Sequence, residues 1–368
     1  MAKLNKTRTK IIIYLIFLIL GFLSVYFFIY IEYAFHLVKH QVHVLISHEP
    51  LEKIESNLTE NHKTKIKIFI EAKEYGKNIY NLKKSNVYES FVKLPREKLG
   101  WNLTAAYPLE LKAKEFYFPF IGKFGYLGFF SESLLKKWKN NYIQNNFDTY
   151  ENEIAAYSTI GFFNDPVFST YLEYSDYFLL RLIFHEMAHE KLFFDEDTEF
   201  SEGIASFIEK VMVKEFLKNK FPDKKNIFNI NENLNINNSV NKEVNTLEEK
   251  LKKLFSSNKS DSDKLKEKKL LYEKFRKKIE ILDKNKDLQL LTKQILKMKD
   301  LNNAWLIQYK RYRPHQSGFN FLLKECNDDI ICWFRRLEKL KSCSKENRNI
   351  LLSQSLPYSE LLKKCQNN

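Results

Sequence analysis

The sequence has no cysteine before residue 326 and no cysteine pair with CxxC spacing. The missing pair argues against a zinc knuckle. An even number of cysteines confined to one short segment predicts two disulfides, with three possible pairings. The four residues are Cys326, Cys332, Cys343 and Cys365. We expect these bridges to close a C-terminal helical cap in an oxidising compartment.

The chain also lacks any DNA- or RNA-binding signature, although its 368 residues carry a net charge of +14. Its lysines are spread widely and accompany many Asn, Ile and Phe residues. We therefore predict no nucleic-acid partner. An attraction to anionic lipid or to an acidic partner is the alternative that this charge leaves open.

Residues 11–31 contain no charged side chain, and as a helix they would extend about 30 Å, enough to cross a bilayer. The positive-inside rule then predicts that residues 1–10 are a cytoplasmic basic tail and that residues 11–31 are a single-pass anchor in the cytoplasmic membrane. Everything from residue 32 would lie on the outer, periplasmic or extracytoplasmic, side. A cleaved signal peptide is the alternative, but the run is long and ends in bulky residues. No cysteine near its end could carry a lipid anchor.

The stretch His185-Glu186-Met187-Ala188-His189 is an HExxH motif. The apolar residues 177–184 that precede it contain no glycine or proline, which predicts a buried helix. Four residues apart on a helix, His185 and His189 share one face and can bind one zinc ion. Glu186 is then close enough to take a proton from a zinc-bound water. The motif predicts a zinc metallopeptidase with Glu186 as the general base.

A catalytic zinc usually has three protein ligands, and Glu202 is the candidate for the third. Apolar residues from Phe200 to Ile208 predict a second helix, and Ser201 is its candidate N-cap, which would place Glu202 in the first turn. A carboxylate there gives the ligand arrangement of Glu-type zincins, with one Zn²⁺ per chain. The competing carboxylates are Asp195, Asp197, Glu199 and Glu209.

The periodicity of the remaining chain predicts a mostly helical α+β protein with a zincin-like metallopeptidase domain, an N-terminal transmembrane helix and a long helical arm. After the anchor we expect four regions. They are a juxtamembrane helical region (32–99), a zincin-like catalytic core (100–221), a Lys/Asn-rich helical arm (222–300) and a C-terminal helical cap with the four cysteines (301–368).

Within these regions we expect helices at 62–95, 131–145, 242–256, 262–283, 301–312, 316–325, 329–341 and 357–365, two or three strands in 101–132, and a loop at 226–240. A further strand is expected at 155–162, and Tyr157 to Gly161 would be the cleft edge that pairs with a substrate backbone. The two charged helices between 242 and 283 predict a long solvated hairpin, which offers a surface for a protein partner.

Four blocks together resemble the bacterial putative aminopeptidases, a family of membrane-associated HExxH proteins. The blocks are YFPFIGKFGYLGFF (117–130), AYSTIGFFNDP (156–166), IFHEMAHEKLFFDEDTEFSEGIASFIE (183–209) and LNNAWLIQYKRY (301–312). The resemblance implies a zinc-dependent peptidase outside the cytoplasmic membrane. It also implies His185 and His189 as ligands, Glu186 as the base and Glu202 as the third ligand.

The chain departs from the family pattern at two places near these residues. Glu190 replaces a common Gln after the second His, and Ser201-Glu202-Gly203 replaces Asn-Glu-Ser. Glu190 adds a negative charge near the metal, and Ser201 lacks an amide that could contact substrate. Many relatives are lipoproteins, whereas this chain carries a predicted transmembrane anchor.

We therefore expect a membrane-anchored zinc peptidase, and our first hypothesis is that it is an aminopeptidase. The candidates for stabilising the oxyanion are Tyr309, Tyr312, Tyr157 and Arg311, with Tyr312 placed first. The candidates for holding the substrate ammonium are Glu190, Asp165 and Glu199. The alternatives are a membrane-tethered zinc endopeptidase and a non-catalytic anchored scaffold or binding protein. An intact Glu186 argues against the last, because a structural metal site needs no general base.

Overall fold

The computed structural model describes residues 30–54, 58–82, 88–118, 122–154, 165–195, 197–220, 230–284, 290–298, 300–311, 316–348 and 356–366. The chain divides into two compact units, Met1–His48 and Glu49–Asn368. In the first unit, residues 30–46 form a helix. The predicted anchor lies outside the described residues except for its last two positions. Among the helices that are described, none combines the length and the apolar character needed to cross a bilayer.

The second unit is mostly helical α+β, as the sequence predicts. Its strands are β2 (Ser90–Val92), β3 (Trp101–Ala106), β4 (Phe116–Phe118), β5 (Gly122–Phe124), β6 (Leu127–Phe129), β7 (Asp148–Glu153) and β8 (Val167–Phe168), and β1 (His48–Pro50) begins at the junction of the units. Its α-helices are α2 (Leu51–Ile54), α3 (Glu60–Ile79), α4 (Glu132–Gln144), α5 (Asp176–Lys191), α6 (Thr198–Lys220), α7 (Ile230–Phe255), α8 (Asp261–Lys284), α9 (Leu290–Lys297), α10 (Asn303–Arg311), α11 (Gln316–Glu325), α12 (Ile330–Glu338) and α14 (Tyr358–Gln366). Two short 3₁₀ helices are η2 (Ser169–Glu173) and η4 (Lys339–Ser342).

Strand β3 is the centre of a three-stranded antiparallel sheet, with β6 on one side and β7 on the other. Leu103 lies opposite Leu127 on β6 and Glu151 on β7. Residues 102–106 are all buried, because α4 covers this sheet and packs Trp138 against Phe129 at 6.0 Å between ring centroids. A separate hairpin pairs β4 with β5, and β2 pairs in parallel with β8.

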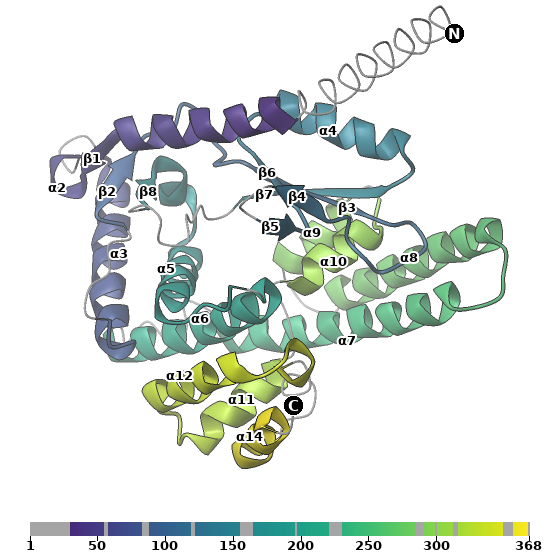
Figure 1. Ribbon diagram of the computed structural model, residues 1–368. Helices are drawn as coiled ribbons and strands as arrows, with labels where there is room; N and C mark the ends of the chain where they lie inside the picture. The colour runs from purple at the N-terminus through teal and green to yellow at the C-terminus, as the bar shows by residue number, and fades with distance from the viewer. Residues whose placement is uncertain are drawn as a thin grey trace, which may run out of the picture. The chain divides into compact units, whose positions relative to one another are not determined.

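The helices α3, α5 and α6 form the layer that carries the HExxH motif (Figure 1). Gly76 is the point of close approach between α3 and α5, since a Cβ atom there would lie 2.8 Å from Sδ of Met187. Aromatic rings fill the space between the three helices, with Phe184 of α5 5.9 Å from Phe216 of α6 and Tyr75 of α3 5.4 Å from Phe216. The motif helix is therefore fixed from two sides.

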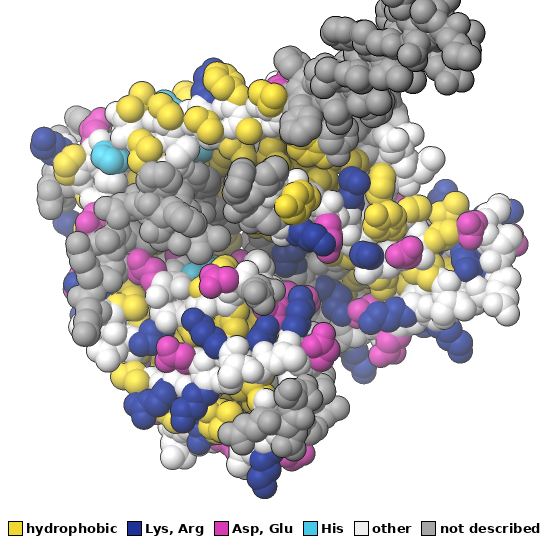
Figure 2. Space-filling view, in the orientation of Figure 1, with side chains coloured by type: hydrophobic (Ala, Val, Ile, Leu, Met, Phe, Trp, Pro, Cys, Tyr) yellow, Lys and Arg dark blue, Asp and Glu magenta, His cyan; other side chains and the backbone are white. Residues whose placement is uncertain are grey.

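The arm is a helical hairpin of α7 and α8, as predicted, but it is not simply solvated. Its facing sides form an apolar cluster that includes Val244, Leu251, Phe275 and Ile279, and this cluster continues into Trp305 of α10. Figure 2 shows Lys and Arg side chains mixed with Asp and Glu along the outer face of the arm. The arm thus has a buried apolar interface between its two helices and a charged outer surface.

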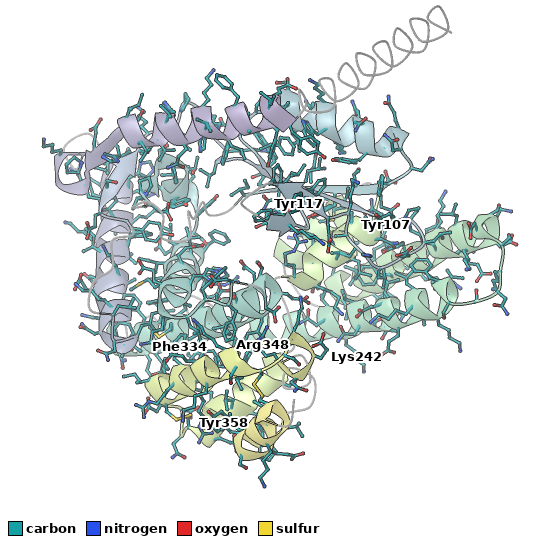
Figure 3. All side chains as sticks on the ribbon, viewed as in Figure 1. Tyr107, Tyr117, Lys242, Phe334, Arg348 and Tyr358 are labelled. Atoms are coloured by element: carbon teal, nitrogen blue, oxygen red, sulfur yellow. A yellow bond between two sulfur atoms is a disulfide. The ribbon has the colours of Figure 1, made fainter. Side chains whose placement is uncertain are left out.

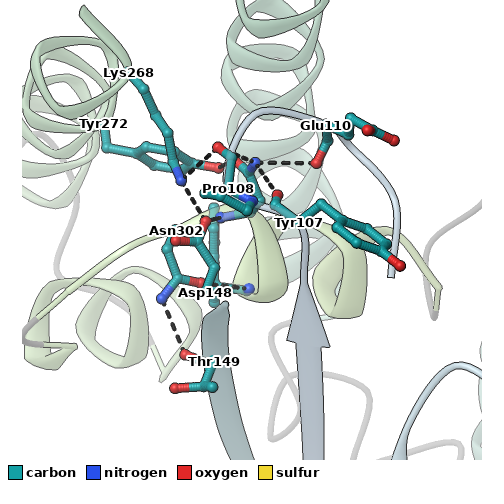
Figure 4. A network of polar contacts seen from close by, with 10 residues as sticks. Tyr107, Pro108, Glu110, Asp148, Thr149, Lys268, Tyr272 and Asn302 are labelled. Atoms are coloured by element: carbon teal, nitrogen blue, oxygen red, sulfur yellow. Dashed lines mark hydrogen bonds and ion pairs between the residues drawn. The ribbon is translucent and has the colours of Figure 1, made fainter. Parts of the chain in front are cut away.

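Asn303 is the centre of a polar network that ties α10 to the arm and the sheet. Figure 4 shows this network, with the partners Tyr107, Pro108, Glu110, Asp148 and Tyr272 labelled. Its side-chain amide donates to the carbonyl oxygens of Tyr107, Pro108 and Glu110 at 3.0 to 3.1 Å, and its Oδ1 accepts from the Tyr272 hydroxyl at 3.0 Å. The backbone N–H of Asn303 donates to Asp148 at 2.9 Å. Asn303 is fully buried and Tyr272 is nearly so, so these hydrogen bonds satisfy the polar atoms of Asn303 inside the protein and fix one orientation of α10.

The cap consists of α11, α12, η4 and α14, and both predicted disulfides are confirmed. They pair Cys326 with Cys332 and Cys343 with Cys365. The cap packs on α6 through aromatic rings: Phe319 lies 5.7 Å from Phe200, and Trp333 lies 5.3 Å from Phe207. The disulfides therefore close a small helical subdomain whose inner face rests on α6.

Several predicted boundaries were wrong. The helix predicted for 62–95 ends at Ile79, and residues 90–92 form β2. The region 101–132 contains four strands, where two or three were predicted. The predicted loop at 226–240 is helical from residue 230, because α7 begins there. The strand predicted for 155–162 lies outside the described residues.

Candidate functional site

Helix α5 positions the HExxH residues. Ser175 caps its N-terminus by accepting a hydrogen bond from the backbone N–H of Phe178 at 3.3 Å. Most of the apolar run before the motif is buried, as predicted, so one face of the helix is fixed in the core; the buried residues are Leu179, Leu180, Leu182, Ile183 and Phe184. His185 and His189 project from this helix with side chains 14% and 11% exposed. Glu186 is buried, with 7% of the residue exposed.

Helix α6 begins at Thr198, four residues earlier than a helix capped by Ser201 would begin. Asp197 acts as the cap, because its Oδ1 accepts from the backbone N–H of Phe200 at 3.4 Å. Ser201 is fully buried inside the helix, where its hydroxyl bonds to the backbone of Phe194 and Asp197. The prediction of Ser201 as N-cap was therefore wrong. Glu202 stands in the second turn rather than the first.

His185, His189 and Glu202 converge as the sequence predicts. The Nε2 atoms of the two histidines are 3.2 Å apart, and they lie 3.3 Å and 3.6 Å from the two carboxylate oxygens of Glu202. One potential ligand atom from each of the three residues lies within 4.8 Å of the others. This is the group that could hold a metal ion among the described residues. The competitors Asp195, Asp197, Glu199 and Glu209 are not part of it.

The two histidines differ in electrostatics because their ring nitrogens face each other. Burial opposes the charged form of His185, but the hydrogen-bonded carboxylates of Glu202 and Glu209 outweigh it and raise its pKa well above the usual value. Burial and the adjacent charge of His185 lower the pKa of His189 to about 4. Two protons do not fit between nitrogens 3.2 Å apart, so in the absence of a metal the two histidines are not both protonated at Nε2.

Glu209 lies behind His185 and does not join the three converging residues. Its Oε2 is 2.9 Å from Nδ1 of His185, and its Oε1 accepts from Nε of Arg181 at 2.9 Å. Burial would raise the pKa of Glu209, but Arg181 and His185 lower it to about 2. An ionised carboxylate can only accept, so Nδ1 of His185 carries the hydrogen and Nε2 is left to face His189 and Glu202.

Tyr126 and Arg311 form a pair on the Glu202 side of the site. The guanidinium of Arg311 lies 4.6 Å from the centre of the Tyr126 ring and donates to the carbonyl of Gly125 at 3.2 Å. Burial, and then the nearby charge of Glu202, raise the pKa of Tyr126. Arg311 in turn helps to lower the pKa of Glu202. Sequence reasoning named Arg311 but missed Tyr126, although Tyr126 lies in the block 117–130 that carries the resemblance.

The other oxyanion candidates have different outcomes. Tyr312 and Tyr157 lie outside the described residues, so their roles stay predictions. Tyr309 is held by the arm: its hydroxyl donates to Asn241 at 2.8 Å, and its ring lies 5.4 Å from Trp305. These contacts explain Tyr309 as a packing residue between α10 and α7.

The structure also distinguishes among the three carboxylates that were predicted to hold a substrate ammonium. Tyr88 is buried, and its raised pKa is caused first by burial and then by the charges of Glu186, Asp165 and Glu190, among others. The carboxylates of Glu186, Asp165 and Glu190 therefore all lie close enough to Tyr88 to act on it. Glu199 is exposed in the first turn of α6 and has no such electrostatic link to Tyr88.

Comparison with known proteins gives one finding. The family model described as "Putative aminopeptidase" matches residues 32–352, which cover most of the chain and contain every described residue of the site. Neither a search of curated proteins nor a search of solved structures found a match. Since the model spans well over half of the sequence, the chain belongs to the putative aminopeptidase family.

Proposed function

We propose that this protein is a membrane-anchored zinc aminopeptidase, in which His185, His189 and Glu202 hold one Zn²⁺ and Glu186 is the general base. The observation that carries the proposal is the convergence of two imidazole nitrogens and a carboxylate beside the buried Glu186. The family suggests peptidase activity. The metal, the mechanism and the membrane anchor go beyond what the family suggests and are our proposal.

The distances support a zinc ion at this place. Ligand atoms about 2.0–2.1 Å from a tetrahedral zinc lie about 3.3 Å from one another. The three separations found are 3.2, 3.3 and 3.6 Å. A donor set of two histidines and one glutamate is also the one that zinc peptidases use.

The surrounding residues would carry out the proton transfers. When bound, zinc would act as a Lewis acid toward the water and the scissile carbonyl. Glu186 takes a proton from the attacking water and delivers it to the leaving amine. Tyr126 is the donor that we place beside the developing oxyanion, together with the predicted Tyr312. Arg311 packs against the Tyr126 ring, 4.6 Å from its centre, and so helps to hold it in place.

An aminopeptidase must also bind the free ammonium of its substrate. Asp165 and Glu190 are the carboxylates that we assign to this task, because both act electrostatically on Tyr88 together with Glu186. A carboxylate in this region would bind the ammonium close to the scissile bond, as an aminopeptidase requires. We propose this pair in preference to Glu199.

We place the catalytic unit outside the cytoplasmic membrane. The uncharged run of residues 11–31 and the basic residues before it support a single-pass anchor with an outer catalytic domain. The two disulfides of the cap support an oxidising compartment.

Peptide digestion by the purified full-length chain tests the proposal. We expect the wild type, loaded with zinc, to shorten a peptide mixture one residue at a time from the N-terminus. Glu186→Gln should abolish cleavage and retain zinc, because Glu186 is not among the three converging ligands. Mass spectrometry of the products and zinc analysis of both proteins measure the two effects.

The cleavage products distinguish an aminopeptidase from an endopeptidase and from a binding protein. Internal cuts that disappear in Glu186→Gln would mean that the protein is an endopeptidase. Peptides that stay intact with zinc-loaded wild type would contradict peptidase activity and favour a binding protein. Equal cleavage by Glu186→Gln would show that another group is the base.

A further inference from the structure

The segment between α5 and α6 sets the relative position of the metal-ligating residues. His185 and His189 lie on α5 and Glu202 lies on α6, so the distances of 3.2 to 3.6 Å among their ligand atoms depend on where α6 begins. The connection runs only from Leu192 to Asp197. If Asp197 moved, Glu202 would move with it, because about one and a half turns of helix connect the two residues.

Asp197 is fixed by contacts inside the protein. Its side chain is 1% exposed, and its Oδ1 caps α6 through the backbone N–H of Phe200. Its carbonyl oxygen accepts from the backbone N–H of Ser201 at 3.1 Å and from the Ser201 hydroxyl at 3.2 Å. A buried carboxylate in this position needs a positive partner.

Arg348 of the cap supplies that partner. Its Nε and Nη2 atoms both lie 3.1 Å from Oδ2 of Asp197, and its Nη1 donates to the carbonyl oxygen of Cys343 at 2.6 Å. The guanidinium lies 5.2 Å from the centre of the Phe194 ring, in the same connection. Figure 3 shows Arg348 at the side of the cap that faces α6.

The contacts of Arg348 use all three nitrogens of a rigid planar group, so the position of Asp197 is tied to the backbone at Cys343. Lys345 also approaches Asp197, at 3.5 Å, but its side chain is 49% exposed and makes the weaker contact. Arg348 lies inside the loop that the Cys343–Cys365 disulfide closes. The Cys326–Cys332 disulfide closes a different loop of the cap.

We propose that Arg348 is a positioning residue for the third metal ligand, acting through Asp197, and that the Cys343–Cys365 disulfide holds Arg348 in place for this task. This inference rests on the proposed zinc site. The cap is then part of the metal site's support, not only a cover for the apolar face of α6. Glu202 owes its place to a contact made more than 140 residues away in the sequence.

Zinc affinity of the full-length chain, measured by competition with a chromophoric chelator, tests this role. Arg348→Met removes the charge and keeps the length of the side chain, and Asp197→Asn keeps an oxygen for the helix cap. We expect each to raise the Kd for zinc about 10-fold, the lower end of the effect of losing a supporting contact at a metal site. Arg335→Met, an exposed arginine of α12, is the matched control and should leave the Kd unchanged.

The two disulfides provide a second, independent comparison. Replacing Cys343 and Cys365 together by Ser should weaken zinc binding, whereas replacing Cys326 and Cys332 together should not. Circular dichroism and Tm are measured in parallel, since a loss of general stability lowers Tm without changing the Kd of the folded protein. Arg348→Lys retains the charge but not the planar group, so its Kd should lie between those of the wild type and Arg348→Met.

The outcomes separate this inference from the proposed function. A wild type that binds no zinc would overturn both. A wild type that binds zinc, with unchanged Kd in Arg348→Met and Asp197→Asn, would overturn the positioning role alone. If Arg348→Met does not fold, Arg348→Lys and Asp197→Asn decide, and wild-type Kd values in both would contradict the inference.

Discussion

His185 is held by contacts on both of its ring nitrogens. Glu209 accepts a hydrogen bond from Nδ1, and Arg181 holds Glu209 in place from the preceding turn of α5. Arg181 is the one charged residue in the run 177–184 of α5, and a charge in that position needs a partner. The chain Arg181–Glu209–His185 therefore sets the tautomer and the ring orientation of one proposed ligand.

Glu209→Gln tests this support. The amide keeps the size of the side chain but removes the charge that orients His185 and balances Arg181. We expect zinc affinity to fall about 10- to 100-fold, measured by chelator competition. Glu199→Gln is the matched control, because Glu199 is an exposed residue of the same helix. Equal Kd values in the two variants would show that Glu209 does not support the metal site.

At this scale, local spacing predicted much of the site. Two histidines four residues apart on a helix must share a face, and Glu202 follows after a short connection, so their convergence could be expected from the sequence. The partner of Nδ1 of His185 could not be predicted from the sequence. Glu209 is one of several carboxylates in this region, and only the packing of α6 against α5 shows that it is the one that contacts His185. Tyr126 was missed for the same reason, since its approach to Glu202 depends on the β-hairpin region and α10.

Among the elements, strand β3 depends on a glycine at its start. A Cβ atom on Gly100 would lie 2.6 Å from the carbonyl oxygen of Phe129 on β6, and backbone cannot yield as a flexible side chain can. Gly100→Ala should therefore lower the free energy of unfolding by about 1–3 kcal/mol, as overpacking does in well-packed cores. Urea denaturation followed by circular dichroism measures the loss.

Gly128→Ala on β6 is the control for this effect. The added Cβ would have no contact shorter than 3.8 Å, which is ordinary van der Waals distance. We expect a much smaller change in stability than for Gly100→Ala. If the two variants lost the same amount, close approach at Gly100 would not be the cause.

Helices were predicted better than strands because their signals are local. The four helices that were predicted after residue 300 lie close to their predicted ranges, and α4 begins next to Ser131, where its predicted range starts. Strand β7 was missed, since its sequence DTYENE has no apolar alternation and it is recognised only by its pairing with β3. At the start of α6, Asp197 is the cap and is held there by its buried contact with Arg348. The local sequence around Ser201 gives no sign of this long-range contact.

For the whole molecule, a metal bound between α5 and α6 would couple folding to zinc. Zinc about 1,000-fold above its Kd stabilises a protein that binds it only when folded by about 4 kcal/mol. We therefore expect a chelator to lower Tm by several degrees, measured by differential scanning calorimetry. The Tm of Glu202→Ala should respond much less. An equal response in this variant would place the metal elsewhere.

The metal content of the full-length chain tests the central claim most directly. Wild-type protein and the Glu202→Ala and His189→Ala variants are dialysed against a dilute chelator, and zinc per chain is measured by plasma mass spectrometry. The account predicts one zinc per chain in the wild type and almost none in the two variants. A variant without Glu202 that keeps a full zinc with wild-type affinity, or a wild type that binds none, would contradict it.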